Sequence, residues 1–461
     1  MGVYLLVMVG AATSLTGAGA ACTTWPLCDG RLFVPTGDAA AIAWGHRVLA
    51  LFVGVLVLLT AVIGLRVERT RRIRASLILA AALYPVQILL GALTATTATT
   101  ASLSALHLLV AMLIFGGLLL ALAWTLERRH PSIGDDRRIH ETDDGNGGDP
   151  SPIDVVDTGA RGHGEPVVRT AGTDRRTLAL AYLQMTKPRL MWLLCLVAAA
   201  GMALAAGPSL SPAIVVATLS AGVLAIGASG TFNHVLERDV DRRMARTSDR
   251  PLATDLVPVR NALVFGILLA LGSLAIFYVF VNPLAAVLGL TAIVFYSVIY
   301  TLVLKPNTVQ NTVIGGAAGA LPALIGWAAV TETIGLPALV LAAVIFCWTP
   351  AHFYNLALAY KEDYARGGFP MLSVVRGERV TRKHIVLYAG ATFLVAGALA
   401  AVETLGWLYA TTGIVFGALF LWAVIRLHHE QTERAAFRAF HASNAYLGML
   451  LLAIVVDALV F

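Results

Sequence analysis

One stretch of the chain decides its fold: residues 261–304 read NALVFGILLALGSLAIFYVFVNPLAAVLGLTAIVFYSVIYTLVL. The stretch contains no Asp, Glu, Lys or Arg, and Asn282-Pro283 interrupts it near its middle. A helix needs about 20 apolar residues to cross a bilayer. We therefore predict two membrane-spanning helices, at 259–280 and 283–303, joined by a short turn.

The composition of the whole chain agrees with this interpretation. Of 461 residues, 58% are hydrophobic and 13% are charged, and the mean hydropathy is +0.78. Soluble domains have about 45–50% apolar and about 25% charged residues. These values exclude a soluble enzyme, a disordered chain and a disulfide-rich secreted domain. They predict an all-α polytopic protein of the lipid bilayer, whose net charge of +6 belongs to cytoplasmic loops and not to a nucleic-acid surface.

About thirteen apolar runs are long enough to span a membrane, four in one group and nine in another. The runs are 1–21, 41–65, 75–96, 104–124, 189–207, 211–232, 259–280, 283–303, 310–330, 336–357, 384–402, 406–426 and 442–461. Within 133–165, nine acidic residues face three arginines, a net charge of −6, which is typical of a disordered linker. We therefore predict a four-helix unit (1–125), an acidic cytoplasmic linker (126–180) and a nine-helix unit (181–461).

Arginine and lysine gather in every second loop. The basic loops are 66–74, 233–258, 304–309, 358–383 and 427–441, and the intervening loops 97–103, 208–210, 281–282, 331–335 and 403–405 contain no Lys or Arg. Because basic loops stay on the cytoplasmic side, one alternating topology fits all thirteen runs. It predicts a multi-pass protein of the cell membrane, with a cytoplasmic N-terminus and an external C-terminus.

The strongest chemical signal follows the sixth run, in residues 233–252, which read NHVLERDVDRRMARTSDRPL. Asn233, Glu237 and Asp241 are spaced four residues apart, so they share one helix face. Three oxygen-bearing side chains on one face repel each other unless a cation lies between them. Hard oxygen ligands suit Mg²⁺, which typically takes one or two carboxylates together with substrate phosphates.

A second acidic cluster, around Asp363 in 360–372, lies on the same side of the membrane. Two facing clusters predict Mg²⁺ ions that bridge a diphosphate. The side chains expected to neutralise its outer oxygens are Arg246, Arg250, Lys305 and Lys361. The alternative is two solvated loops that merely carry charges.

A diphosphate at the membrane surface, with apolar helices behind it, indicates a substrate with a lipid tail. Departure of the diphosphate leaves an allylic carbocation on the lipid tail, and this cation needs a cavity that excludes water. Phe295, Tyr296 and Tyr300 are candidates for stabilising that cation through their ring faces, although for each of them alone packing in the core is the stronger expectation.

The first outer loop contains Cys22 and Cys28. Outside the membrane they are expected to form a disulfide if the turn allows it, or to remain two unpaired thiols. Their spacing does not match zinc-ligand spacings.

His46 and His107 lie inside two of the runs, each a few residues from the outer end. Polar residues inside a membrane are costly and usually functional. Two histidines at equal depth predict ligation of one haem iron from both sides. The alternative is a pair of hydrogen-bonded core histidines.

The nine-helix unit, over about 180–461, resembles the intramembrane aromatic prenyltransferases and, within them, the protohaem IX farnesyltransferases or haem O synthases. The resemblance rests on Thr186-Lys187-Pro188-Arg189, the 233–252 block, Thr349-Pro350-Ala351-His352-Phe353 and Gly367-Gly368-Phe369-Pro370-Met371-Leu372. One residue departs from the pattern, because Glu237 stands where the family usually has Asp.

The resemblance implies transfer of a farnesyl group from farnesyl diphosphate to a vinyl group of haem B, giving haem O. It implies that Asn233, Glu237, Asp241 and Asp363 bind the Mg²⁺-diphosphate, assisted by Lys305 and Arg250. It also implies either a haem contact or a structural role for His352.

The four-helix unit, over about 1–125, resembles one half of haem A synthase, a family that oxidises haem O. Trp44-Gly45-His46-Arg47 and Leu106-His107 carry this likeness. The family has an acidic residue three positions before the first histidine, where this chain has Ala43. The resemblance implies haem binding or delivery, with haem A synthase or terminal oxidase assembly as partners.

Three rival functions remain open at this point. One is prenyl transfer to a quinone precursor or an archaeal lipid, and another is a non-catalytic membrane haem-binding protein. The third is an ion-coupled transporter, against which the position of the carboxylates at a membrane edge argues.

Overall fold

The computed structural model describes residues 1–15, 18–22, 24–28, 35, 37–97, 101–129, 174–402 and 405–460. Within these ranges the elements are helices and no strand is present. Twelve helices are long and apolar enough to cross a membrane, which confirms the predicted all-α polytopic fold. The acidic segment 133–165, which carries most of the predicted linker, lies outside the described residues.

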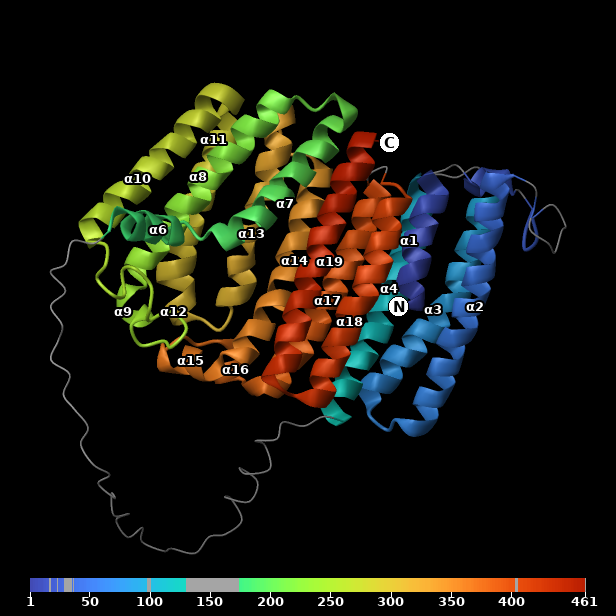
Figure 1. Ribbon diagram of the computed structural model, residues 1–461. Coiled ribbons are helices and arrows are strands. Elements are labelled where there is room, and N and C mark those ends of the chain that lie inside the picture. The colour runs from blue at the N-terminus through green and yellow to red at the C-terminus, as the bar shows by residue number, and fades with distance from the viewer. Residues whose placement is uncertain are drawn as a thin grey trace, which may run out of the picture.

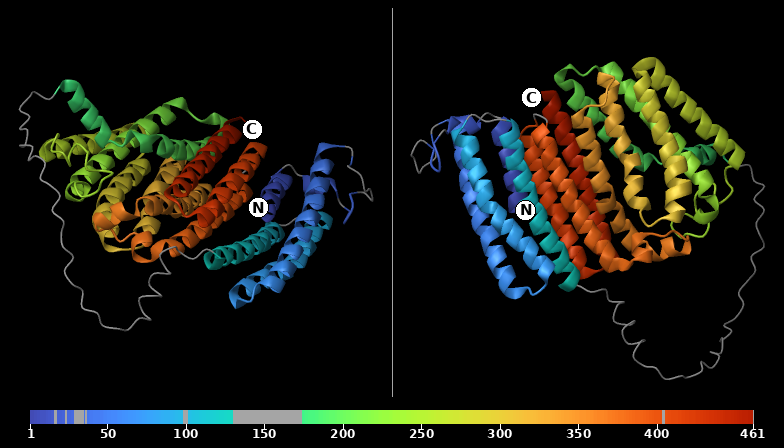
Figure 2. Two further views of the ribbon diagram at one scale, coloured as in Figure 1. Left: turned by 60° about the horizontal axis from the view of Figure 1, so that its bottom comes forward. Right: turned by 180° about the vertical axis from the view of Figure 1, so that it is seen from behind.

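The N-terminal helices stand beside the remaining helices in every view (Figures 1 and 2). They are α1 (Gly2–Leu15), α2 (Asp38–Val67), α3 (Arg71–Thr96) and α4 (Ala101–Arg129), with a short 3₁₀ turn at Ala18–Ala21.

The second group begins with α6 (Arg175–Met185), which runs across the bundle, and contains the other long helices (Figure 1). These are α7 (Pro188–Ala206), α8 (Pro212–Leu236), α10 (Val259–Ile276), α11 (Pro283–Val294), α13 (Asn311–Thr331), α14 (Leu336–Ala359), α17 (Gly377–Val402), α18 (Trp407–Glu430) and α19 (Glu433–Val460). The short helices are α9 (Arg238–Asp241), α12 (Lys305–Asn307), α15 (Lys361–Arg366) and α16 (Leu372–Val375), and π-helical segments at Phe277–Val281 and Phe295–Leu304 extend α10 and α11.

The first predicted run, 1–21, forms a shorter helix than the others. Helix α1 has 14 residues, which corresponds to about 21 Å at 1.5 Å per residue. This length is less than the ~30 Å of a bilayer core. The apolar part of α1, Gly2–Ala11, is accordingly not one of the twelve helices that are long enough to span a membrane. Helix α1 instead packs against α17 and α18 of the second group.

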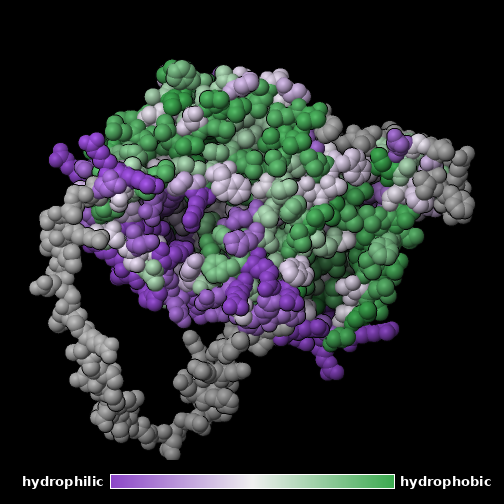
Figure 3. Space-filling view, in the orientation of Figure 1, coloured by the Kyte–Doolittle hydropathy of each residue, from purple (hydrophilic) through white to green (hydrophobic). Residues whose placement is uncertain are grey.

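The basic loops lie together at one end of the bundle. The α2–α3, α8–α10, α14–α17 and α18–α19 connections are at the lower end in Figure 1. Hydrophilic residues gather along this end, and hydrophobic residues cover the flanks above it (Figure 3). The basic loops therefore lie at the same end of the bundle, as the alternation of basic and uncharged loops along the sequence predicts.

Two contacts join the N-terminal helices to the second group at this polar end. Lys383 on α17 forms an ion pair of 2.7 Å with the Glu127 carboxylate on α4. Arg379 donates a hydrogen bond of 3.0 Å to the backbone carbonyl of Glu127. Deeper in the bundle, the Tyr4 ring of α1 packs on Phe393 of α17, with 5.2 Å between ring centroids.

Helices α7 and α13 approach each other backbone to backbone at two glycines. A Cβ atom at Gly326 would lie 2.1 Å from the carbonyl oxygen of Ala198, and one at Gly201 would lie 2.5 Å from that of Ala323. Small residues permit such close packing in membranes. Because both helices line the cavity described below, their spacing also sets its shape.

We predict that Gly326→Ala lowers the thermal unfolding temperature, because the new methyl group forces α7 and α13 apart at a cost of about 1–3 kcal/mol. The matched control is Gly222→Ala on α8, where nothing lies within 4 Å of the added atom. That control is expected to be neutral or slightly stabilising. Equal unfolding temperatures for the two variants in detergent would contradict the close packing.

Candidate active site

The C-terminal end of α8 places three oxygen-bearing side chains in succession. The amide of Glu237 donates to the Asn233 carbonyl (2.9 Å), and the amide of Asp241 donates to the Glu237 carbonyl (2.8 Å). The α-helical hydrogen-bond pattern thus continues through this junction and keeps the four-residue spacing. The side chains of Asn233, Glu237 and Asp241 are buried, with exposed fractions of 2%, 6% and 2%.

Each of these side chains meets a cation from a different element. Lys187 donates to the side-chain oxygen of Asn233, and Lys305 pairs with Glu237. The Arg250 guanidinium bonds both carboxylate oxygens of Asp241, at 2.9 and 2.8 Å. Because an unpaired charge is costly away from water, the burial of these side chains requires such partners.

The surroundings shift the pKa values of these groups in different directions. Burial alone would raise the pKa of Glu237, but Lys305, Lys187 and Arg250 together hold it below its usual value. Burial raises the pKa of Asp241 in spite of Arg250. Burial also lowers the pKa of Lys187 to about 7, which the negative charge of Glu237 opposes. At each of these groups, burial and the charges of the neighbouring side chains therefore act on the pKa in opposite directions.

Sequence reasoning used Lys187 only as part of a family motif and did not place it in the site. Its backbone is left-handed, with φ 57° and ψ 56°, which is costly for a residue with a side chain and often marks a functional position. The ammonium group also donates to the Tyr296 hydroxyl at 3.1 Å. This contact joins the start of α7 to the π-helical segment.

A cavity of about 980 Å³ opens beside these residues. Its polar end is lined by Lys187, Asn233, Glu237 and Lys305, and apolar residues of the surrounding helices line the rest. The rings of Tyr296 and Tyr300 face it and lie 5.6 Å apart, centroid to centroid. The π-helical segment that carries both rings is of a kind found frequently at functional sites.

Asp363 belongs to the second acidic cluster, and its carboxylate holds the loop that follows α9. It accepts hydrogen bonds from the backbone amides of Ala245 (2.7 Å) and Arg246 (3.2 Å) and from Arg366 (2.8 Å). Burial would raise the pKa of Asp363, but these donors lower it overall. Asp241 is tied to the same loop through Arg250, so both acidic clusters lie at one end of the bundle.

The remaining predicted phosphate-binding cations occupy different positions. The Arg246 guanidinium lies over the rings of Tyr360 (4.8 Å) and Tyr364 (5.3 Å). It lines both the large cavity and a second one of about 620 Å³. Lys361 lines only the second cavity, where it pairs with Glu378 at 3.0 Å. Asp363 lines the second cavity as well.

Among the described residues, no three His, Cys, Asp or Glu side chains form a metal-binding cluster. Mg²⁺ does not require one, because substrate phosphates and water complete its six ligands. Glu237 and Asp241 offer two carboxylates on one face, and Asn233 adds an amide oxygen. This donor set fits a Mg²⁺ ion that arrives with a diphosphate.

Another part of the cavity lining is aromatic. His352 on α14 lies between Trp348 and Phe440, and all three line the cavity. The Nδ1 atom of His352 is 2.7 Å from the Ser443 hydroxyl on α19. Ser443 and Trp348 were part of no predicted site, because their contacts join residues about ninety positions apart in the chain.

The N-terminal helices carry the two other predicted histidines. His46 is on α2 and His107 on α4. The Nδ1 atoms of both are buried and have no hydrogen-bond partner in the part of the chain that the structure describes, while Nε2 of His107 lies 3.1 Å from the amide nitrogen of Gln87.

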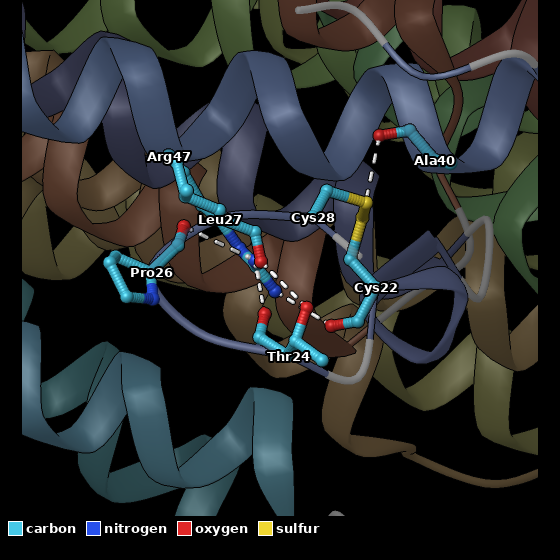
Figure 4. Close-up of a disulfide and its surroundings, with 7 residues drawn as sticks. All are labelled: Cys22, Thr24, Pro26, Leu27, Cys28, Ala40 and Arg47. Carbon is cyan, nitrogen blue, oxygen red and sulfur yellow. Dashed lines mark hydrogen bonds between the residues drawn. A yellow bond between two sulfur atoms is a disulfide. The ribbon is translucent and has the colours of Figure 1, made fainter. Parts of the chain in front are cut away.

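Cys22 and Cys28 are joined by a disulfide near the start of α2 (Figure 4). The guanidinium of Arg47, the residue after His46, donates to the carbonyls of Cys22 (2.7 Å) and Thr24 (2.7 Å). The disulfide loop is therefore anchored to the helix turn that carries His46.

Two family models match different parts of the chain. Residues 193–450 match the UbiA prenyltransferase family, and residues 1–143 match a family described as cytochrome oxidase assembly protein.

Two curated relatives are similar in sequence. Over its full length the chain is 62% identical to the protoheme IX farnesyltransferase of Haloarcula marismortui, of which 96% is covered. It is 46% identical over 62% of its length to protoheme IX farnesyltransferase 1 of Saccharopolyspora erythraea, of which 93% is covered.

A solved structure of digeranylgeranylglyceryl phosphate synthase is similar in fold, with a TM-score of 0.52 at 15% identity. It covers 61% of this chain and 99% of that one.

We predict that Asp363→Ala speeds hydrogen exchange at the amides of Ala245 and Arg246, because both lose a charged acceptor worth about 1–3 kcal/mol. Hydrogen-exchange mass spectrometry of the loop 242–250 measures this. Glu362→Ala is the control, since Glu362 is exposed and adjacent. Unchanged exchange in Asp363→Ala would show that the carboxylate does not hold the loop.

Proposed function

Because the chain belongs to the protohaem IX farnesyltransferases of the UbiA prenyltransferase family, we propose that its large cavity is the site of farnesyl transfer. The chain is a membrane prenyltransferase that farnesylates a vinyl group of haem B to give haem O. The observation that carries the assignment of the site is a buried carboxylate face, met by three cations, at the polar end of an apolar cavity.

The polar end is proposed to bind the diphosphate of farnesyl diphosphate. Asn233, Glu237 and Asp241 hold Mg²⁺, which supplies charge stabilisation to the departing diphosphate. Lys305 and Arg250 then exchange their carboxylate partners for phosphate oxygens, and Lys187 exchanges the amide oxygen of Asn233 for one. The exchange keeps every buried charge paired throughout.

Asp363, Arg246 and Lys361 are assigned to the outer side of the same diphosphate. Arg246 supports this assignment because it lines both cavities, and Asp363 supports it because it fixes the backbone of Arg246. Lys361 and Asp363 share the second cavity with Arg246.

The apolar part of the cavity takes the farnesyl tail and the acceptor. Tyr296 and Tyr300 present ring faces that stabilise an allylic cation, and the surrounding helices keep water from quenching it. The haem lies toward α14 and α19, where His352 contacts it.

The polar end faces the cytoplasm in this proposal, with the N-terminus inside and the C-terminus outside the cell membrane. The concentration of Arg and Lys in the loops at this end supports that orientation.

The four-helix unit is proposed to bind haem through His46 and His107. Two imidazoles with unpartnered, buried nitrogens support this role, as does the match to a cytochrome oxidase assembly family. Haem delivery is preferred to haem oxidation, because Ala43 replaces the acidic residue of the haem A synthase pattern. Haem A synthase or a terminal oxidase under assembly is the proposed partner.

We predict that Asp241→Asn lowers farnesyl transfer by roughly 100-fold or more, the scale on which groups that stabilise transition-state charge act. Purified protein is incubated with haem B, farnesyl diphosphate and Mg²⁺, and the porphyrin product is analysed by mass. Removal of Mg²⁺ with a chelator is expected to have the same effect.

Asp239→Asn is the matched control, because Asp239 is two residues away but its side chain is 78% exposed. Full activity of Asp241→Asn would contradict the assignment of the metal site. Prenylation of a quinone precursor in place of haem B would contradict the assignment of the acceptor.

We also predict that the full chain with His46→Ala and His107→Ala loses a bis-imidazole haem spectrum but keeps farnesyl transfer. The physical reason is that these histidines lie on helices α2 and α4, which do not line the transfer cavity. Absorbance spectroscopy and the product assay measure the two outcomes. A variant that retains the spectrum would exclude these histidines as ligands.

A further inference from the structure

Ser443 on α19 organises two side chains in the wall of the large cavity. Its hydroxyl contacts Nδ1 of His352 at 2.7 Å, and its backbone carbonyl accepts a hydrogen bond of 2.9 Å from Trp348 Nε1. The three residues are buried, with exposed fractions of 0% for Ser443, 5% for His352 and 4% for Trp348. None of these contacts is needed to bind the diphosphate.

The hydrogen bonds of Ser443 fix the tautomer of His352. The Ser443 hydroxyl donates its single hydrogen to the backbone carbonyl of Phe440, at 2.7 Å. It can therefore only accept from His352, which must carry its proton on Nδ1. The lone pair of the neutral imidazole is consequently on Nε2.

The imidazole ring is also fixed in orientation. It is stacked on the Trp348 ring, with 4.2 Å between centroids and 15° between planes. Phe440 covers its other face at 4.2 Å and 28°. Rotation of His352 would break the hydrogen bond to Ser443 and both ring contacts.

The Nε2 atom forms no hydrogen bond with any residue that the structure describes, although His352 lines the cavity. Proton-accepting chemistry would place an imidazolium charge between two apolar rings inside the membrane, which is unfavourable. Coordination of a metal requires the neutral form, with a free lone pair. A fixed neutral imidazole is the usual protein ligand of haem iron.

We propose that Nε2 of His352 ligates the iron of the acceptor haem. This inference rests on the proposed function and adds the role of one residue to it. Because an axial ligand stands perpendicular to the porphyrin plane, a fixed imidazole also fixes that plane. His352 is then a positioning residue that fixes the location and the tilt of the porphyrin relative to the farnesyl cation.

The test compares ferric haem B with metal-free protoporphyrin IX, which has the same ring and vinyl groups but no iron. Both are titrated into the full chain carrying His46→Ala and His107→Ala, with and without His352→Gly. We expect His352→Gly to weaken haem B binding about tenfold or more, and to leave protoporphyrin IX binding unchanged. Added imidazole is expected to fill the space and restore haem affinity.

Two further variants complete the experiment. Ser443→Ala keeps the imidazole of His352 but removes the hydrogen bond that fixes its tautomer. We therefore expect a smaller loss of affinity, again for haem B only, together with a change in the absorption bands that report the iron ligands. His441→Ala, an exposed histidine on the same helix, is the control and is expected to bind both porphyrins normally.

An equal loss of both porphyrins in His352→Gly, or no loss of either, would overturn the proposal. This outcome is independent of the farnesyl transfer assay, because no farnesyl diphosphate is present. A failed transfer assay with an iron-dependent effect of His352 would instead overturn the proposed function alone.

Discussion

The burial of two carboxylates at the edge of the membrane is the constraint on which the rest of the site depends. Glu237 and Asp241 are almost fully enclosed, and an enclosed negative charge is stable only beside a positive one. The three partners come from the start of α7, the loop after α9 and the end of the π-helical segment. Charge pairing therefore draws together segments that the apolar helices alone would leave apart, and the same charges suit a magnesium diphosphate.

The sequence predicts those features that depend on near neighbours. Apolar runs locate the spanning helices because each segment inside a bilayer must satisfy its own backbone hydrogen bonds. The four-residue spacing places Asn233, Glu237 and Asp241 on one face. The first run, 1–21, forms the shorter helix α1 because part of the run forms a 3₁₀ turn. The sequence does not place Lys187 in the site, because its position depends on its left-handed backbone. The hydrogen bonds of Asp363 to Ala245 and of Ser443 to His352 join distant positions, and no local pattern encodes them.

The two groups of helices have complementary shapes where they pack against each other. Tyr4 of α1 lies where Gly413 and Gly417 of α18 leave space, since Cβ atoms there would be 3.1 Å from its hydroxyl and 3.4 Å from its ring. The ion pair of Glu127 with Lys383 joins α4 to α17 at the polar end. In the proposed function, a four-helix unit held in this way would keep haem close to the enzyme that modifies it, without a separate encounter between proteins.

In the proposed reaction, two different parts of the cavity lining hold the two substrates. Lys187, Glu237 and Lys305 are proposed to fix one end of the donor, and α14 with α19 to present the imidazole of His352 to the acceptor. In this proposal each part orients only one substrate, so both are needed to set where the new bond forms. The side chain that pairs with Lys305 is that of Glu237, which has one methylene more than an aspartate would have at this position. Its effect is therefore expected on the alignment of donor and acceptor more than on the binding of either, since the same charges remain paired.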